Sequence, residues 1–128
     1  MKLVDTTFLI DMTNGVESTK KIIQNNETLL TTQINMHEFL RGLFLKGISK
    51  NKIDKTMELF ENIKVLQLDD NSIISSAKIW AEMVKTGKEL PTIDCLIAGI
   101  ALSNNINTII TEDVTHFSRI KGLKVETY

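Results

Sequence analysis

Four stretches of the chain place a carboxylate where a strand-like run ends or a helix-like run begins. Asp5 follows a short apolar run, and Glu38 lies in NMHEFLRG. Asp94 lies in PTIDCLIAG, and Asp113, preceded by Glu112, follows the apolar run in TIITED. Carboxylates gathered at one place repel one another, and a hard divalent cation such as Mg²⁺ or Mn²⁺ relieves that repulsion. The acids therefore predict a metal site if the fold brings them together.

A cation held by carboxylates can activate water and neutralise charge on a phosphodiester. The sequence contains no Gly-x-Ser-x-Gly elbow, no Walker A loop and no Gly-x-Gly-x-x-Gly fingerprint. Metal-assisted hydrolysis is therefore the reaction class that the residues favour.

Each acid also has a purely structural interpretation. Asp5 could cap the helix that follows it, and Asp94 could stabilise the positive end of its own helix. Glu38 could be a solvated helix residue. The joint placement of the acids favours the functional interpretation. Three further acids are interpreted as capping or turn residues: Asp11, Asp69 and Asp70.

Short apolar runs alternate with longer amphipathic runs along the chain. The predicted strands are Lys2–Val4, Thr28–Thr32, Lys64–Leu68, Asn107–Thr111 and Leu123–Glu126. Helices are predicted between them, with assigned ranges Asn35–Lys46, Lys50–Ile63, Asn71–Lys85 and Ile93–Ser103. The predicted N-caps are Ser49, Asp70 and Thr92, and Gly87 is predicted to end the third of these helices.

Alternation of strands and helices predicts an α/β fold, because a parallel sheet needs long crossover connections and is covered on both faces. We expect a three-layer α/β/α sandwich with a central parallel sheet of about five strands. Ligands of such sheets bind outside the carboxyl ends of the strands, where the strand order reverses. Asp5 falls at such an end.

Composition sets broad limits on the protein. At 128 residues the chain, 1–128, is expected to form a single domain. With 15 basic and 16 acidic side chains its net charge is -1, so a nucleic acid would have to meet a local basic patch. Cys95 is the only cysteine, and no signal-peptide or membrane-span pattern is present. We expect a cytoplasmic protein without a membrane partner.

The segments DTTFLID, TTQINMHEFLRG, PTIDCLIAGIA and IITEDVTHF resemble, in order and spacing, the acidic motifs of PIN-domain proteins. The likeness is greatest to the VapC-type ribonuclease toxins of prokaryotic toxin-antitoxin pairs, and it covers nearly the whole chain. It implies that Asp5, Glu38 and Asp94 bind the metal and that Asp113 takes the fourth acidic position. Glu112, next to that position, could take the place of Asp113.

The same resemblance implies roles for neighbouring residues. Thr6 and Thr111 match hydroxyl residues beside the first and fourth acids. Two positions depart from the family pattern, because Thr7 stands where many members have Asn and His116 stands where an acid is common. His116 is a candidate substrate contact, whereas His37 is interpreted as a structural or surface residue.

Basic side chains near the acids are candidate phosphate contacts. Arg41 lies one helical turn after the second acid, and Lys46 opens a basic stretch that continues with Lys50, Lys52 and Lys55. Such a run is usually a solvated face, but it could also attract an RNA backbone without regard to sequence.

The resulting hypothesis is a metal-dependent endoribonuclease that uses Mg²⁺ or Mn²⁺ and acts as the toxin of a type II toxin-antitoxin pair. The resemblance further implies a homodimer and a cognate antitoxin that covers the acidic site. The sequence alone does not distinguish a toxin from a housekeeping nuclease. The residues are also compatible with a PIN-like RNA-binding or scaffold protein without catalysis. A receiver-like phosphoacceptor domain is less compatible, because no Lys ends the fifth strand as a receiver requires.

Overall fold

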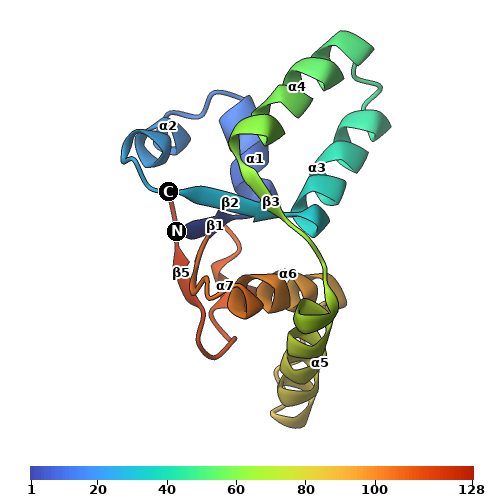
Figure 1. Ribbon diagram of the computed structural model, residues 1–128, viewed down its shortest axis with the longest axis vertical. Coiled ribbons are helices and arrows are strands. Elements are labelled where there is room, and N and C mark those ends of the chain that lie inside the picture. The colour runs from blue at the N-terminus through green and yellow to red at the C-terminus, as the bar shows by residue number, and fades with distance from the viewer.

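The chain forms a five-stranded parallel sheet between two layers of helices (Figure 1). The structure is a computed structural model that describes residues 1–128. The strands are β1 (Lys2–Val4), β2 (Leu29–Thr32), β3 (Lys64–Leu66), β4 (Thr108–Ile110) and β5 (Lys124–Glu126). The predicted three-layer α/β/α sandwich with a central parallel sheet is confirmed.

The strand order is β3-β2-β1-β4-β5. The chain moves outward from β1 to β3, then returns to place β4 on the other side of β1, so the order reverses between β1 and β4. Receiver-like domains have the order 2-1-3-4-5. The observed order is different, which excludes a receiver-like domain.

Helices cover both faces of the sheet. They are α1 (Thr6–Thr13), α2 (Glu17–Gln24), α3 (Gln33–Leu45), α4 (Lys50–Asn62), α5 (Asp70–Lys85), α6 (Thr92–Ser103) and α7 (Val114–Phe117). Figure 1 shows α1 to α4 on one face and α5, α6 and α7 on the other. None of these helices is long and apolar enough to cross a membrane.

Neighbouring residues of the central strands face opposite cores. Leu3 and Ile109 belong to the larger core under α5 and α6, whereas Val4 and Ile110 belong to the smaller core under α1 and α3. All four side chains are fully buried. Burial on both faces explains why these strands read as continuous apolar runs rather than as alternating ones.

The start of α4 agrees with the prediction, and the start of α5 does not. Ser49 caps α4 by accepting a hydrogen bond from Lys52 N. Asp70 was the predicted cap of α5, but the cap is Asp69, whose carboxylate accepts from Ser72 N at 2.9 Å. The Ser72 hydroxyl in turn accepts from Asp69 N at 2.8 Å. This reciprocal capping box requires a spacing of three residues, which only Asp69 offers to Ser72.

Other predicted boundaries are wrong by a few residues. Thr92 does not cap α6, because Pro91 occupies the cap position without a side-chain bond and its ring sets φ near the helical value, at −53°. The strand predicted at Lys64–Leu68 ends at Leu66, and other strands are also shorter than predicted. Gly87 ends α5 as predicted, with φ of +71°.

A close crossing between α5 and α6 depends on a glycine. A Cβ added at Gly99 would lie 2.7 Å from Ser76 N and 2.8 Å from both Ser72 O and Ser76 Cβ. Two of these three atoms are backbone atoms of α5, so a small side-chain rotation cannot make room. Gly99 therefore lets α6 sit directly on α5.

We predict that Gly99→Ala lowers the free energy of unfolding by about 1–3 kcal/mol, because the added methyl group overpacks this crossing. Gly42→Ala is the matched control, since a Cβ there would meet no atom within 4 Å. Within a helix that change should be neutral or stabilise by up to about 1 kcal/mol. Urea unfolding of both variants measures the difference, and equal effects would contradict a close crossing at Gly99.

Candidate functional site

The structure brings the predicted acids to one cavity of about 130 Å³. Asp5 follows β1 and Asp113 follows β4, while Glu38 comes from α3 and Asp94 from the first turn of α6. The cavity lies at the carboxyl ends of β1 and β4, where the strand order reverses. This is the position at which open parallel sheets bind ligands.

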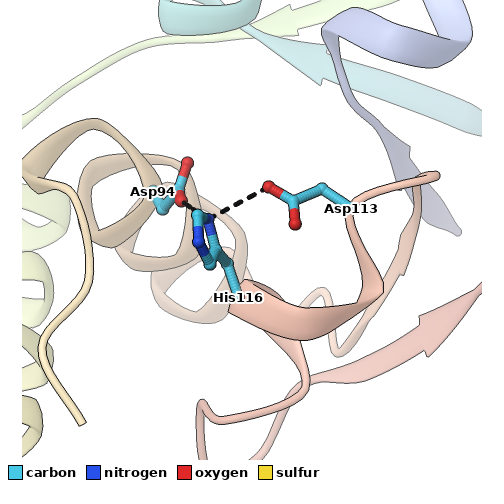
Figure 2. A group of neighbouring side chains, drawn as sticks. All are labelled: Asp94, Asp113 and His116. Carbon is cyan, nitrogen blue, oxygen red and sulfur yellow. Dashed lines mark hydrogen bonds and ion pairs between the residues drawn. The ribbon is translucent and has the colours of Figure 1, made fainter.

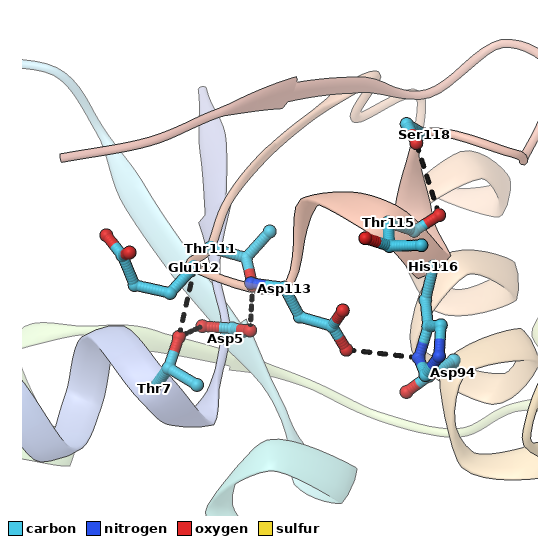
Figure 3. A network of polar contacts seen from close by, with 9 residues as sticks. All are labelled: Asp5, Thr7, Asp94, Thr111, Glu112, Asp113, Thr115, His116 and Ser118. Carbon is cyan, nitrogen blue, oxygen red and sulfur yellow. Dashed lines mark hydrogen bonds and ion pairs between the residues drawn. The ribbon is translucent and has the colours of Figure 1, made fainter.

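Asp5 is held by three hydrogen-bond donors. Its Oδ1 accepts from the Thr7 hydroxyl at 2.7 Å and from Phe8 N at 3.2 Å, and its Oδ2 accepts from the Thr111 hydroxyl (Figure 3). The bond from Phe8 N makes Asp5 the cap of α1, so the structural interpretation holds beside the functional one. A carboxylate has about four acceptor positions, which leaves one on Oδ2 for another ligand.

Burial and hydrogen bonding act in opposite directions on the pKa of Asp5. The residue is only 6% exposed, and loss of solvent raises the pKa of its carboxyl group above the usual value. The hydroxyl groups of Thr111 and Thr7 act in the opposite direction, because they stabilise the ionised form. A cation beside Asp5 would act in the same direction as these hydroxyls.

Glu38 is oriented by a chain of polar side chains that starts in the sheet. The Thr32 hydroxyl donates to Asn35 Oδ1 at 2.7 Å, and Asn35 Nδ2 donates to Thr6 Oγ1 at 3.2 Å. Thr6 then donates to Glu38 Oε1 at 3.1 Å. Asn35 is fully buried and lines the cavity, but it was not predicted from the sequence. The only sequence feature that could have indicated this role is its position one helical turn before Glu38, on the same face of α3.

Asp94 and Asp113 lie on either side of one histidine (Figure 2). His116 Nδ1 is 2.7 Å from Asp94 Oδ2 and 3.1 Å from Asp113 Oδ2. Burial raises the pKa of Asp94, His116 lowers it, and the negative charges of Asp113 and Glu38 raise it further. His116 was predicted as a substrate contact, and the structure places it against the acids themselves.

Asp113 and Glu112 point to different places. Asp113 lines the cavity, and its N–H donates to Thr111 Oγ1 at 2.8 Å. Glu112 is exposed and is not part of the cavity wall, although its N–H donates to Thr7 Oγ1 at 3.3 Å (Figure 3). The geometry therefore favours Asp113 over Glu112 as the fourth acid.

The candidate phosphate contacts fall into two groups. Arg41 lies 3.5 Å from Glu38 Oε2 at the edge of the site, and Lys46 lines a neighbouring cavity that shares Glu38. The rest of the basic stretch, Lys50, Lys52 and Lys55, is exposed at the start of α4. Figure 1 shows that the turn between α3 and α4 is the part of this hairpin farthest from the sheet, so these lysines are not brought to the acids.

The donor set fits a hard divalent cation. Four carboxylates from separate segments line one small cavity, and hydroxyl or amide groups orient two of them. Two larger cavities, of about 370 and 300 Å³, lie elsewhere and are lined mainly by apolar side chains. Neither contains a cluster of acids, so the smallest of these three cavities is the one equipped for metal chemistry.

Comparison with known proteins identifies a matching family and two relatives. The family model of the PIN domain matches residues 2–123. Ribonuclease VapC1 of Methanocaldococcus jannaschii is 31% identical over 85 residues, which are 64% of this chain and 62% of that protein. The chain thus aligns with less than two thirds of that relative's length. The tRNA(fMet)-specific endonuclease VapC of Salmonella typhimurium is 23% identical over 104 residues, 81% of this chain and 78% of the relative.

Solved structures share the fold. VapBC2 from Rickettsia felis, bound to a DNA fragment from its promoter, contains a chain with a TM-score of 0.85 and 18% identity, covering 99% of this chain and 98% of that one. VapBC-1 from nontypeable Haemophilus influenzae contains a chain with a TM-score of 0.82 and 25% identity. The match covers 98% of this chain and 96% of that one. The likeness extends over essentially the full length of both chains.

We predict that ionised Asp94 destabilises the metal-free protein. Its pKa in the folded state is raised, so the free energy of unfolding in EDTA should fall as pH rises above the unfolded pKa near 4, and the loss is complete above the folded pKa. Asp94→Asn removes this titration. Its stability should decrease less between pH 4 and pH 7, which urea unfolding at a series of pH values measures.

Asp69→Asn provides a control of opposite sign. Hydrogen bonds from Ser72 lower the pKa of Asp69, so its charge stabilises the fold above the unfolded pKa, and this contribution is lost as pH falls. Removing that charge should therefore reduce stability at pH 7. If Asp94→Asn also lost stability at pH 7 in EDTA, Asp94 would be acting as an ordinary stabiliser of a helix end.

Proposed function

The chain belongs to the PIN-domain family, and from this premise we propose that it is a metal-dependent endoribonuclease that hydrolyses RNA phosphodiester bonds. The convergence of four carboxylates on one cavity is the observation that carries the proposal. A non-catalytic RNA-binding or scaffold protein would have no need for a complete acidic site. Acids that serve only as caps would also have no reason to share a cavity.

The proposed metal ligands are Asp5, Glu38, Asp94 and Asp113, and the cation is Mg²⁺ or Mn²⁺. When bound, the cation supplies Lewis acidity, which makes water nucleophilic near neutral pH and neutralises charge on the scissile phosphate. The protein supplies the position of each oxygen. Carboxylates fixed in advance do not have to reorganise when the cation and the substrate arrive.

Thr6 and Thr111 are proposed to position these acids. Each hydroxyl donates to one carboxylate and accepts from another group, which is Asn35 for Thr6 and the N–H of Asp113 for Thr111. A hydroxyl with both roles filled cannot rotate without losing a bond. These contacts orient the carboxylates without bringing in a competing positive charge.

Arg41 and Lys46 are proposed to contact the RNA backbone beside the cleaved bond. Both are exposed. Arg41 lies 3.5 Å from Glu38 Oε2, and Lys46 lines a neighbouring cavity that Glu38 also lines. Contacts to phosphates position the substrate without reading its sequence. The overall charge of -1 makes such local contacts necessary, since the protein as a whole does not attract a polyanion.

The relatives support a more specific role. The names of two relatives describe VapC nucleases, and two solved structures with the same fold are VapBC assemblies. We therefore propose that this protein is the toxin of a type II toxin-antitoxin pair, that it forms a homodimer, and that a cognate antitoxin covers its acidic site. It would act in the cytoplasm, where its RNA substrate is found.

We predict that the purified protein cuts RNA in the presence of Mg²⁺ or Mn²⁺ and that EDTA stops the reaction. Asp5→Asn should reduce cleavage by at least about 100-fold, because the remaining carboxylates hold the cation poorly. Products should carry 5′-phosphate and 3′-hydroxyl ends, since water attacks and the 2′-hydroxyl takes no part. Gel electrophoresis with end-specific enzymes reads both results.

Two outcomes of that assay would refute the metal mechanism. One is cleavage that persists in EDTA and survives Asp5→Asn. The other is a 2′,3′-cyclic phosphate product, which requires attack by the neighbouring 2′-hydroxyl group of the RNA.

We also predict that Asp113→Ala costs at least about tenfold more in kcat/KM than Glu112→Ala. Only Asp113 lines the acidic cavity, and the contact of Glu112 with the site is made by its main chain, which alanine retains. Steady-state cleavage of one RNA by both variants tests the order. A larger loss in Glu112→Ala would move the fourth acid to that position.

A further inference from the structure

The imidazole of His116 contacts two of the four acids. Its Nδ1 faces both Asp94 and Asp113, and one atom from each of the three residues lies within 4.8 Å of the others. The two carboxylates come from distant parts of the chain, on α6 and after β4. Figure 2 shows the ring between the two carboxylate groups. Three potential ligand atoms therefore converge, and one of them is a nitrogen.

The spacing of these atoms matches that of ligands around one ion. Neighbouring ligands of an octahedral cation with bonds of about 2.0–2.1 Å are separated by about 3 Å. The distances from Nδ1 to the oxygens of Asp94 and Asp113 are 2.7 and 3.1 Å, which bracket that value. In the metal-free protein Nδ1–H donates to Asp94 Oδ2. The other neutral tautomer, protonated at Nε2, offers the lone pair of Nδ1 instead.

The position of His116 is determined by its neighbours on α7. Phe117 is fully buried in the larger core and anchors this four-residue helix. Asp113 precedes the helix and His116 lies three residues later, so the two side chains share one face of the turn. The ring is thus presented to Asp94 by a buried anchor rather than by a free loop.

We infer that His116 is a ligand of the metal and that this nitrogen makes the site prefer Mn²⁺ to Mg²⁺. The inference rests on the proposed function, because it concerns the same metal site. Mg²⁺ takes oxygen ligands and loses its water reluctantly, whereas transition-metal ions accept imidazole more readily. A neutral imidazole also contributes one negative charge fewer than a carboxylate would at the same place. The nitrogen donor therefore favours Mn²⁺, while the missing charge weakens the binding of both divalent ions.

Pulsed electron paramagnetic resonance of the Mn²⁺-loaded protein tests the ligand directly. A coordinated imidazole produces modulation from its ¹⁴N nucleus in the spin echo. The chain contains 2 histidines, so the signal can be assigned with two variants. The coupling should be present in wild type and in His37→Gln, whose exposed side chain lies on α3, and absent in His116→Gln.

Calorimetric titration with each metal tests the preference. His116→Gln should weaken Mn²⁺ binding by at least about tenfold. His116→Asp restores an oxygen donor and a charge, so the ratio of the Mg²⁺ and Mn²⁺ dissociation constants should fall by at least about tenfold. His37→Gln should leave both constants unchanged. Circular dichroism of each variant verifies the fold, and absence of nitrogen coupling in the wild-type spin echo is decisive without any variant.

Specific results would overturn the inference. Wild-type protein that binds Mn²⁺ without nitrogen coupling, or coupling that survives His116→Gln, would exclude His116 as a ligand. Tighter metal binding in His116→Gln would show that the ring obstructs the site. In those cases metal-dependent RNA cleavage that is lost in Asp94→Asn would leave the proposed function intact. Failure of wild-type protein to bind Mn²⁺ or Mg²⁺ would overturn both proposals.

Discussion

The burial of the Asp5 carboxylate is the constraint on which the site depends. A charged group that loses its water must receive hydrogen bonds in exchange, or it becomes neutral. Asp5 receives them from the start of α1 and from the residue that follows β4. These donors can reach one carboxylate only if β4 lies directly beside β1, as it does at the reversal of strand order. The hydrogen bonds that Asp5 needs are thus available only because the sheet topology pairs β4 with β1.

The other acids follow the same logic with different partners. Glu38 receives its bond through a chain of neutral hydroxyl and amide groups, and Asp5 is held by neutral donors alone. Neutral donors orient a carboxylate without cancelling its charge, so the negative potential of the cavity is kept for a cation. His116 and Arg41 are the two side chains within contact of the acids that can carry a positive charge. Neither side chain lines the cavity wall, so both approach the acids from outside the cavity.

The architecture and the acids could be predicted because both produce patterns that are visible in the sequence itself. Runs buried on both faces mark the strands. Asp5 follows β1 directly and Asp113 lies three residues after the end of β4, so a parallel sheet places them at one edge. The partners of the acids leave no such signal. Asn35 is indistinguishable from a solvated helix residue until the sheet covers it, and the choice between Asp69 and Asp70 as a cap depends on a reciprocal bond with Ser72. Helix α7, with 4 residues, is too short to show a period.

Support for the site also extends to a helix crossing that contains none of its acids. Asp113 and His116 lie at one short helix anchored by Phe117, so their mutual geometry is set locally. Asp94 comes from α6, and its distance from that pair depends on how α6 sits between α5 and the sheet. Gly99 permits the close approach of α6 to α5 that sets this position. A shift of α6 would change the distance from Asp94 to His116 while leaving Asp5 and its donors in place. The part of the cavity nearest α6 is therefore the part whose ligand geometry depends most on packing elsewhere in the protein.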